Sequence, residues 1–291
     1  MKRYSRNFVL AVLLVFSAGA VGVGTRALAA DSSAQETYLT QIRALPWLRG
    51  PAKATIAGNS TLVIPDGYAF LDTASTQKYL ELNKNLGNGK EVMIAPTDLS
   101  WEAYLEFDDA GYVKDDEKID AAALLKTLKE GTEQSNEERQ RRGWHPIHVV
   151  DWAIPPAYNN ATRRLEWATI LASENHQSAN FFTKILGRRG YTSVELVARP
   201  EDLPTAQQGL NGILTGYTFN SGEGYAEWRP GDKVAEYGLA ALIVGGVAAV
   251  ATKKGFWAVA AGFLATAWKA IVAALVAGGA WFRKLLSKKK D

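Results

Sequence analysis

The acidic stretch GYVKDDEKIDAAALLK, which begins at Gly111, holds the residue types of this chain that most resemble chemistry. Its carboxylates Asp115, Asp116 and Glu117 could hold a hard cation or supply paired groups for acid–base catalysis. The calcium-loop pattern is not met, because that loop needs acids at alternate positions ahead of a glycine. Acids placed just before a helix stabilise the positive end of its dipole. The favoured interpretation is therefore a helix start near Asp120, and a non-standard cation site stays open as the alternative.

The segment HPIHVVD offers a second set of possible metal ligands in His145, His148 and Asp151. Side chains alternate between the two faces of a strand, so His148 is expected to point away from the other two. We therefore expect polar strand-edge residues rather than a zinc site. The sequence contains no P-loop, no nucleophile elbow and no zinc-protease motif, so it indicates neither a catalytic residue nor a cofactor.

The turn LGRRGY places two basic residues between glycines, with Gly187 and Gly190 on either side of Arg188 and Arg189. This pattern predicts a tight turn between two strands with both arginines at its tip. Such arginines commonly meet water or a neighbouring carboxylate. The alternative is a binding site for an anionic lipid headgroup or an acidic partner.

Two other loops are candidates for binding because polar groups at strand ends are held by a rigid sheet. The first, PAYNNATRR at 156–164, contains Asn159 and Asn160, and the second, FNSGEGYAEWRPGD at 219–232, contains Tyr225. The tryptophans of the central segment could line a sugar-binding face, but their alternation with other apolar residues favours packing in the core.

Charge is unevenly distributed along the 291 residues. Of 33 Lys and Arg residues, four lie in 1–30 and eight follow residue 250, which leaves 21 against 29 Asp and Glu and a central net charge of −8. An acidic central segment argues against a nucleic-acid partner, because phosphates need clustered basic residues. The chain has no cysteine, which excludes disulfides, thiol catalysis and a lipoprotein anchor.

Residues 1–30 have the three parts of a secretory signal. Lys2, Arg3 and Arg6 precede an apolar run from Phe8 to Val23, and small residues follow near Ala29. We expect cleavage there, with an uncleaved anchor helix as the alternative. The mature domain is therefore expected to be exported.

Residues 233–291 are apolar, rich in small residues and end in a basic tail. They predict transmembrane helices in the lipid bilayer, although Lys269 interrupts the longer stretch and the first stretch, Tyr237 to Thr252, is short for a span. Basic residues prefer the cytoplasmic side, so a single crossing is favoured. A buried hairpin of a soluble protein is the alternative.

Between these ends, residues 31–232 predict an α+β domain with a largely antiparallel sheet and a few flanking helices. In WEAYLEF, Trp101, Ala103 and Leu105 share one face of a strand. The expected helices are Asp72–Asn85, Asp120–Arg142 and Glu201–Leu214. The expected strands are Ala54–Ile56, Thr61–Ile64, Val92–Ala95, Trp101–Phe107, Ile147–Trp152, Arg163–Leu171, Ala179–Leu186, Ser193–Ala198 and Tyr217–Phe219.

Several blocks of the chain together resemble a known family. The blocks are LVIPDGYAFLD, YLEFDDAGYVKDDEKIDAAALLKTLKEGTEQSNEERQRRGW, RLEWATILAS, ILGRRGYTSVELVA and DKVAEYGLAALIVGG. Over residues 45–250 they are similar to an uncharacterised bacterial membrane-anchored family, domain-of-unknown-function family 2167. The resemblance implies a Gram-negative envelope protein with an exported domain ahead of a C-terminal anchor, and it carries over no catalytic residue.

Two classes of function stay open. The favoured one is a non-catalytic binding or adaptor module that faces the periplasm from the inner membrane and binds an envelope protein or an anionic lipid. The alternative is a periplasmic hydrolase or transferase that uses carboxylates of the acidic stretch, Glu166 or the Asn159–Asn160 loop. Two carboxyls that converge with a raised pKa would favour the enzyme.

Overall fold

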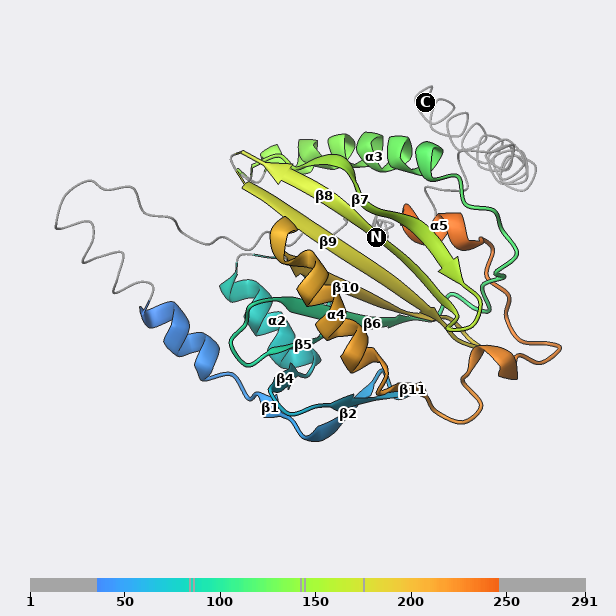
Figure 1. Cartoon of the computed structure of the whole chain (residues 1–291), viewed down its shortest axis with the longest axis horizontal. Coiled ribbons are helices and arrows are strands. Elements are labelled where there is room, and N and C mark those ends of the chain that lie inside the picture. The colour runs from blue at the N-terminus through green and yellow to red at the C-terminus, as the bar shows by residue number, and fades with distance from the viewer. Residues whose placement is uncertain are drawn as a thin grey trace, which may run out of the picture. The chain divides into compact units, whose positions relative to one another are not determined.

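The computed structural model describes residues 36–245, except residues 84, 86, 142, 144 and 175 (Figure 1). The predicted signal segment and most of the predicted anchor region lie outside these residues. In the described part of the chain, no helix is both long enough and apolar enough to cross a membrane. The chain divides into two units between Val244 and Gly245, and the first of them is described below.

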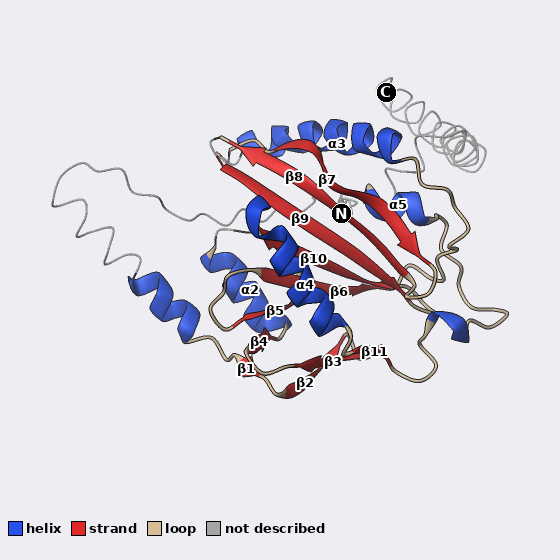
Figure 2. Cartoon of the chain, viewed as in Figure 1, coloured by secondary structure: helices blue, strands red, loops and turns tan. Residues whose placement is uncertain are grey.

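An eight-stranded sheet runs through this unit in the order β1-β4-β5-β6-β10-β9-β8-β7 (Figure 2). All neighbouring strands in it are antiparallel, which confirms the predicted sheet type. Its strands are β1 Leu48–Arg49, β4 Tyr68–Leu71, β5 Val92–Pro96, β6 Glu102–Asp108, β7 His148–Asn159, β8 Arg164–Ser173, β9 His176–Leu186 and β10 Tyr191–Ala198. A smaller antiparallel sheet contains β2 Ala52–Ile56, β3 Ser60–Ile64 and β11 Tyr217–Phe219.

The helices include all three that the sequence predicts. They are α2 Thr73–Leu82, α3 Ala121–Arg141, η1 Pro200–Asp202, α4 Leu203–Leu214, η2 Tyr225–Glu227 and α5 Leu239–Ile243, and residues 36–43 are also helical. The mixed α+β class is therefore confirmed.

One face of the large sheet is covered by α4 and the small sheet. Ala103 and Leu105 of β6 are fully buried on this face, as the alternation in WEAYLEF predicts. They pack in one cluster with Leu210 and Ile213 of α4 and Leu62 of β3. This cluster is the main hydrophobic core, and burial of its apolar surface favours the folded state.

The opposite face is covered at two separate places. Tyr79 of α2 packs there against Met93 and Tyr104, and Leu128 of α3 packs in a second cluster with Trp167. Side chains of β6, β9 and β10 lie on the same face outside these apolar clusters, and several of them are charged. This face therefore combines apolar contacts with a partly buried polar strip.

Helix α3 begins and ends with the groups that the sequence predicts. Asp120 accepts a hydrogen bond from the N–H of Ala123 at 3.0 Å, which confirms the helix start. Arg139 and Arg141 lie in the last turn, where cations favour the negative end of the helix dipole. Gly143 follows with a φ of 69°, a conformation that glycine adopts without strain.

Strand β7 is longer than the predicted Ile147–Trp152 and continues to Asn159. Pro155 and Pro156 lie in this extension, although proline cannot donate a ladder hydrogen bond. The strand accommodates them because it is the edge strand of the sheet and its register shifts between Trp152 and Ile154 and again before Ala157.

Helix α5 belongs to the core of the described unit. The sequence analysis assigns it to the anchor region 233–291, yet Leu239, Leu242 and Ile243 are buried. They pack in the same cluster as Val113 and Trp167. The first apolar residues after the 219–232 loop therefore stabilise this domain.

The two glycines Gly190 and Gly131 should respond oppositely to substitution by alanine. A Cβ atom at Gly190 would lie 1.9 Å from the carbonyl oxygen of Asp108, so Gly190→Ala must displace backbone between β10 and β6. We expect it to lower the free energy of unfolding by about 2 kcal/mol or more. Gly131 has no atom within 4 Å of that position, so Gly131→Ala should raise the free energy by about 1 kcal/mol. Urea unfolding of the full-length chain measures both, and equal effects would contradict this account.

Candidate functional site

Segments that are far apart in the sequence meet where β6, β7, β9 and β11 end. The turn between β9 and β10 is joined to the loop after β6 by a hydrogen bond from the Gly111 N–H to the Arg189 carbonyl at 2.9 Å. It is joined to the loop after β11 by a bond from the Arg188 N–H to the Glu223 carbonyl at 2.8 Å. We call this region the arginine end. It is defined by Arg163, Arg188, Arg189 and their partners Asp115, Asp232 and Glu223.

Arg188 holds the loop after β11 against the sheet. Its guanidinium donates from Nε and Nη2 to the two carboxylate oxygens of Asp232, each at 2.7 Å, and from Nη1 to the Gly222 carbonyl at 3.1 Å. The two charged side chains are only 16% and 15% exposed. The hydrogen bond from Arg188 lowers the pKa of Asp232 to about 2. The predicted tight turn is confirmed, but Arg188 points back to the protein instead of projecting from the tip.

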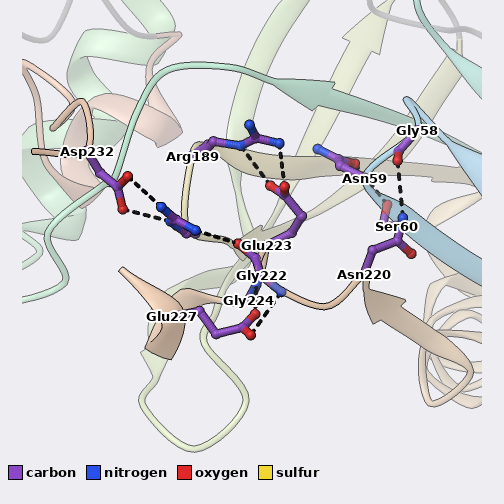
Figure 3. A network of polar contacts seen from close by, with 11 residues as sticks. Gly58, Asn59, Ser60, Arg189, Asn220, Gly222, Glu223, Gly224, Glu227 and Asp232 are labelled. Atoms are coloured by element: carbon purple, nitrogen blue, oxygen red, sulfur yellow. Dashed lines mark hydrogen bonds and ion pairs between the residues drawn. The ribbon is translucent and has the colours of Figure 1, made fainter. Parts of the chain in front are cut away.

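Arg189 is the arginine of the turn that faces solvent. Its side chain is 57% exposed and forms a bidentate ion pair with Glu223 (Figure 3). Glu223 is itself only 17% exposed, so the ion pair holds the guanidinium at the surface. A bidentate pair fixes the plane of the guanidinium, which suits an arginine that presents its remaining donors to a ligand.

The 219–232 loop is ordered by a further carboxylate. Glu227 accepts hydrogen bonds from the N–H groups of Gly222 at 2.9 Å and Gly224 at 2.7 Å (Figure 3). These backbone bonds lower the pKa of Glu227. The loop is consequently held in one conformation by its own charged side chains.

Asp115 lies within this region and pairs with residues of the turn between β7 and β8. It accepts hydrogen bonds from the Tyr158 hydroxyl at 2.9 Å and from Arg163. Burial acts to raise the pKa of Asp115, but hydrogen bonds from Tyr158, Tyr225 and Arg163 outweigh burial and lower it. The Arg163 guanidinium also lies 5.0 Å from the centre of the Tyr225 ring.

Tyr225 connects the loop to the stretch after β6. Its ring stacks on that of Tyr112 at 4.5 Å between centres, and its hydroxyl donates to the Val113 carbonyl at 2.9 Å. Burial raises the pKa of the Tyr225 hydroxyl. The structure thus brings together four of the predicted candidates, which are Arg188, Arg189, Asp115 and Tyr225.

The other candidates do not join this group. Asn159 accepts hydrogen bonds from the N–H groups of Ala161 and Thr162, so it shapes the turn between β7 and β8. Asn160 and Asp116 are exposed. Glu117 accepts from the N–H of Ala240 at 3.0 Å. Of the acidic stretch only Asp120 caps the helix, and the interpretation of the whole stretch as a helix start is therefore too broad.

The two histidines of HPIHVVD contact different carboxylates. His145 pairs with Glu174 at 2.8 Å, and His148 pairs with Glu133 at 2.7 Å. Asp151 accepts from the N–H of Trp152 at 2.8 Å. Within the described residues, no group of three His, Cys, Asp or Glu side chains could hold a metal ion.

A partly buried polar strip on the face that α2 and α3 cover in part was not predicted. Lys184 of β9 donates to the Ser193 hydroxyl of β10, and Asn180 donates to Glu195 at 2.8 Å. Glu106 of β6 lies opposite Ser193. The only available signal was the alternation of the strands, which places these residues on one face but does not show that the face is covered.

Burial perturbs the ionisation of this strip. It raises the pKa of Glu195 from 4.5 to about 7 and also raises the pKa of Glu106. It lowers the pKa of Lys184, although the carboxylates of Glu195 and Glu106 oppose that effect. Perturbed groups of this kind occur both in active sites and in structural networks. Glu166, by contrast, pairs with Thr183 across β8 and β9 on the other face of the sheet.

Comparisons with known proteins place the chain in a family but give no activity. A family model described as "Protein of unknown function (DUF2167)" matches residues 49–277. No curated protein matches the chain. The solution structure of cyanobacterial PsbP (CyanoP) from Synechocystis sp. PCC 6803 has a TM-score of 0.37 at 7% identity and covers 58% of this chain and 92% of that one. The Saccharomyces cerevisiae Ran-binding protein Mog1p has a TM-score of 0.33 at 8% identity, with 59% and 96% covered. Neither likeness is close enough to indicate a shared function.

The pair of Arg188 and Asp232 should contribute stability that is lost in acid. Because the pKa of Asp232 in the folded state is about 2 and lies below its ordinary value, this contribution is present above about pH 4 and is lost as the pH falls towards 2. Asp232→Asn should lower the melting temperature at pH 7 and remove part of the fall between pH 4 and pH 2. Thermal unfolding across that range measures this. Asp116→Asn, at an exposed position, is the control, and identical profiles for Asp232→Asn and the unmodified chain would contradict the prediction.

Glu195 should make stability fall as the pH rises. The folded domain keeps its proton up to about pH 7 whereas the unfolded chain releases it near 4.5, so the folded state binds more protons between these values. Glu195→Gln removes the titrating group, so the variant should not lose this part of its stability as the pH rises. We expect the difference in free energy of unfolding, variant minus unmodified chain, to increase by about 2–3 kcal/mol from pH 5 to pH 8. Urea unfolding at each pH measures the gain, Glu137→Gln is the exposed control, and a difference that does not change with pH would refute the assignment.

Proposed function

The chain belongs to the DUF2167 family of proteins of unknown function, and we propose that it is a non-catalytic binding or adaptor module of the bacterial envelope. In this proposal, the domain up to α5 faces the periplasm, and the apolar part of the region 233–291 that follows α5 holds it at the inner membrane. The signal pattern of residues 1–30 and the apolar composition of the C-terminal region support this location.

The observation that carries the proposal is the state of the carboxylates at the arginine end. Asp115 and Asp232 are bound to arginines, and Glu227 is bound to backbone N–H groups. Their pKa values are all lowered, so at neutral pH they stay ionised and poorly suited to act as general acids or bases. Their contacts instead fix the shape of the loops, which is what a binding surface needs.

The surface that these loops present combines a cation with exposed apolar side chains. Arg189 is 57% exposed, and Trp228 and Val234 are 41% and 39% exposed. Trp228 is supported by the ring of Tyr112 at 5.6 Å between centres. Tryptophan and arginine are the residues that most often dominate binding energy at interfaces. An acidic envelope protein or an anionic lipid headgroup bound here would contact both the cation of Arg189 and the apolar side chains of Trp228 and Val234.

A hydrolase or transferase is the second candidate, and the partly buried polar strip favours it. Glu195 and Glu106 both have raised pKa values, and Lys184 contacts the Ser193 hydroxyl, an arrangement in which an amine could activate a nucleophile. However, Ser193 lies in an interior strand that is paired on both sides. The backbone N–H groups of this strand are used in pairing with the neighbouring strands, so they cannot stabilise an oxyanion. The geometry therefore supports binding better than catalysis.

Crosslinking in intact cells tests the adaptor proposal. A photoreactive phenylalanine at Ala226, an exposed residue of η2 close to Trp228, leaves Arg189 in place. We expect it to trap a specific protein or lipid, identified by mass spectrometry. The same residue at Val150, which is 42% exposed on β7, is the control for random collisions.

Removal of Arg189 should reduce the amount of crosslinked product. Arg189→Ala in the Ala226 background should reduce the trapped product about tenfold, because a charge-assisted contact with an anionic partner contributes more than 1 kcal/mol. The melting temperature should change little, because the guanidinium that is removed is 57% exposed to solvent. Equal trapping at Ala226 and Val150, or trapping that does not depend on Arg189, would overturn the proposal.

A further inference from the structure

The segment WRPGDKV, residues 228–234, contains a tight turn and begins and ends in an exposed apolar residue. Pro230 and Gly231 are the central residues of the turn, and Gly231 has a φ of 98°. The N–H of Asp232 donates to the Arg229 carbonyl at 3.0 Å, which closes the turn. Proline followed by a glycine with positive φ is typical of a type II turn. The segment lies in the orange loop between η2 and α5 (Figure 1).

Tyr112 fixes both apolar ends of this segment. It pairs with Val234 in an isolated β-bridge, and its ring lies 5.6 Å from that of Trp228. The Tyr112 ring also stacks on Tyr225 at 4.5 Å, and the Arg163 guanidinium lies 5.0 Å from the Tyr225 ring. This series of ring contacts ties Trp228 to the domain, yet Trp228 stays 41% exposed. Two exposed apolar residues held beside one tyrosine form a small, preorganised contact surface.

The charged side chains that the segment exposes are cations. Arg229 and Lys233 are both exposed. Arg229 contacts Asp232 through its backbone N–H at 2.7 Å, and the Lys233 ammonium donates to the Asp109 carbonyl at 3.0 Å. The acids of the same loop are engaged within the protein, because Asp232 is 15% exposed and paired with an arginine, and Glu227 is bound to backbone N–H groups. The segment therefore presents two positive charges next to its apolar residues.

The chain leaves the described domain within ten residues of this segment. Val244 is the last residue of the first unit, and it packs against the same apolar cluster as Tyr112. Residues 245–282 follow and contain three tryptophans and no acidic residue. In the proposed function, on whose membrane location this inference rests, they hold the domain at the inner membrane. The segment 228–234 is then tethered close to the bilayer, and tethering raises its effective concentration there.

We propose that the segment 228–234 docks on the surface of an anionic bilayer, so that the partner of the arginine end is the lipid surface itself. Tryptophan favours the interface of a membrane, where its ring lies among the headgroups and its indole N–H stays hydrated. Val234 adds apolar contact beside Trp228. Arg229 and Lys233 meet the lipid phosphates, as basic residues next to an interfacial apolar surface commonly do.

A single spin label tests this inference on the full-length chain, because the chain has no cysteine of its own. Val234→Cys carries the nitroxide, and the chain is reconstituted in vesicles of phosphatidylethanolamine with about one quarter phosphatidylglycerol. Oxygen concentrates in the bilayer whereas a nickel chelate stays in water. Val150→Cys is the matched control, since Val150 is 42% exposed and Val234 39%. We expect the ratio of oxygen to nickel accessibility to be at least about threefold higher at Val234 than at Val150.

Removal of the two cations should withdraw the label from the lipid. Arg229→Gln with Lys233→Gln should lower the ratio at Val234→Cys about twofold or more, because each basic residue near an anionic surface adds to binding. Lys126→Gln with Lys129→Gln, at exposed positions of α3, removes the same charge elsewhere and should leave the ratio unchanged. Equal ratios at Val234 and Val150, or equal effects of the two double variants, would overturn the inference.

The outcome is separable from that of the adaptor proposal. Equal ratios at Val234 and Val150, together with a protein trapped at Ala226 in a manner that depends on Arg189, overturn the bilayer as the partner and leave the adaptor proposal standing. A lipid-exposed label at Val234 with trapping that does not depend on Arg189 supports the inference and overturns the adaptor proposal.

Discussion

The ion pair between Arg188 and Asp232 is the contact on which the arrangement of the arginine end depends. A single guanidinium joins the β9–β10 turn to the carboxylate of Asp232 and the carbonyl of Gly222, which lie at two points of the 219–232 loop. With that loop fixed, Tyr112 pairs with Val234, and the chain then reaches the buried residues of α5. Closing a loop of 44 residues costs entropy, so this pair must be stronger than an isolated surface pair, and its low exposure and bidentate geometry make it so.

Much of the fold could be predicted from local pattern. Period-two alternation identified the strands from β5 to β10, and the acid, glycine and arginine signals placed α3. The very short β1 and β4 were not predicted, because strands of two and four residues show too little alternation to detect. The end of β7 was also missed, since prolines interrupt its ladder and only an edge position tolerates them.

The candidate site could be predicted only in part, because contacts between residues that are far apart in the sequence produce no local sequence pattern. LGRRGY identified a turn correctly, since the positions of its glycines are a local signal. The contact of Asp115 with Arg163 spans 48 residues and has no such signal. The strip of Lys184, Ser193 and Glu195 was overlooked for another reason. Alternation places these residues on the second face of the sheet, and one face of an antiparallel sheet is commonly exposed to solvent. The sequence does not show that α2 and α3 cover part of this face.

The arginine end satisfies most of its own charges, and this limits what it can recognise. Nearly every charge there already has a protein partner, so a ligand must meet the exposed donors of Arg189 and the apolar faces of Trp228 and Val234. Because Arg189 is the exposed cation of this surface, an interaction with an anionic ligand would depend on charge and would be weakened by salt.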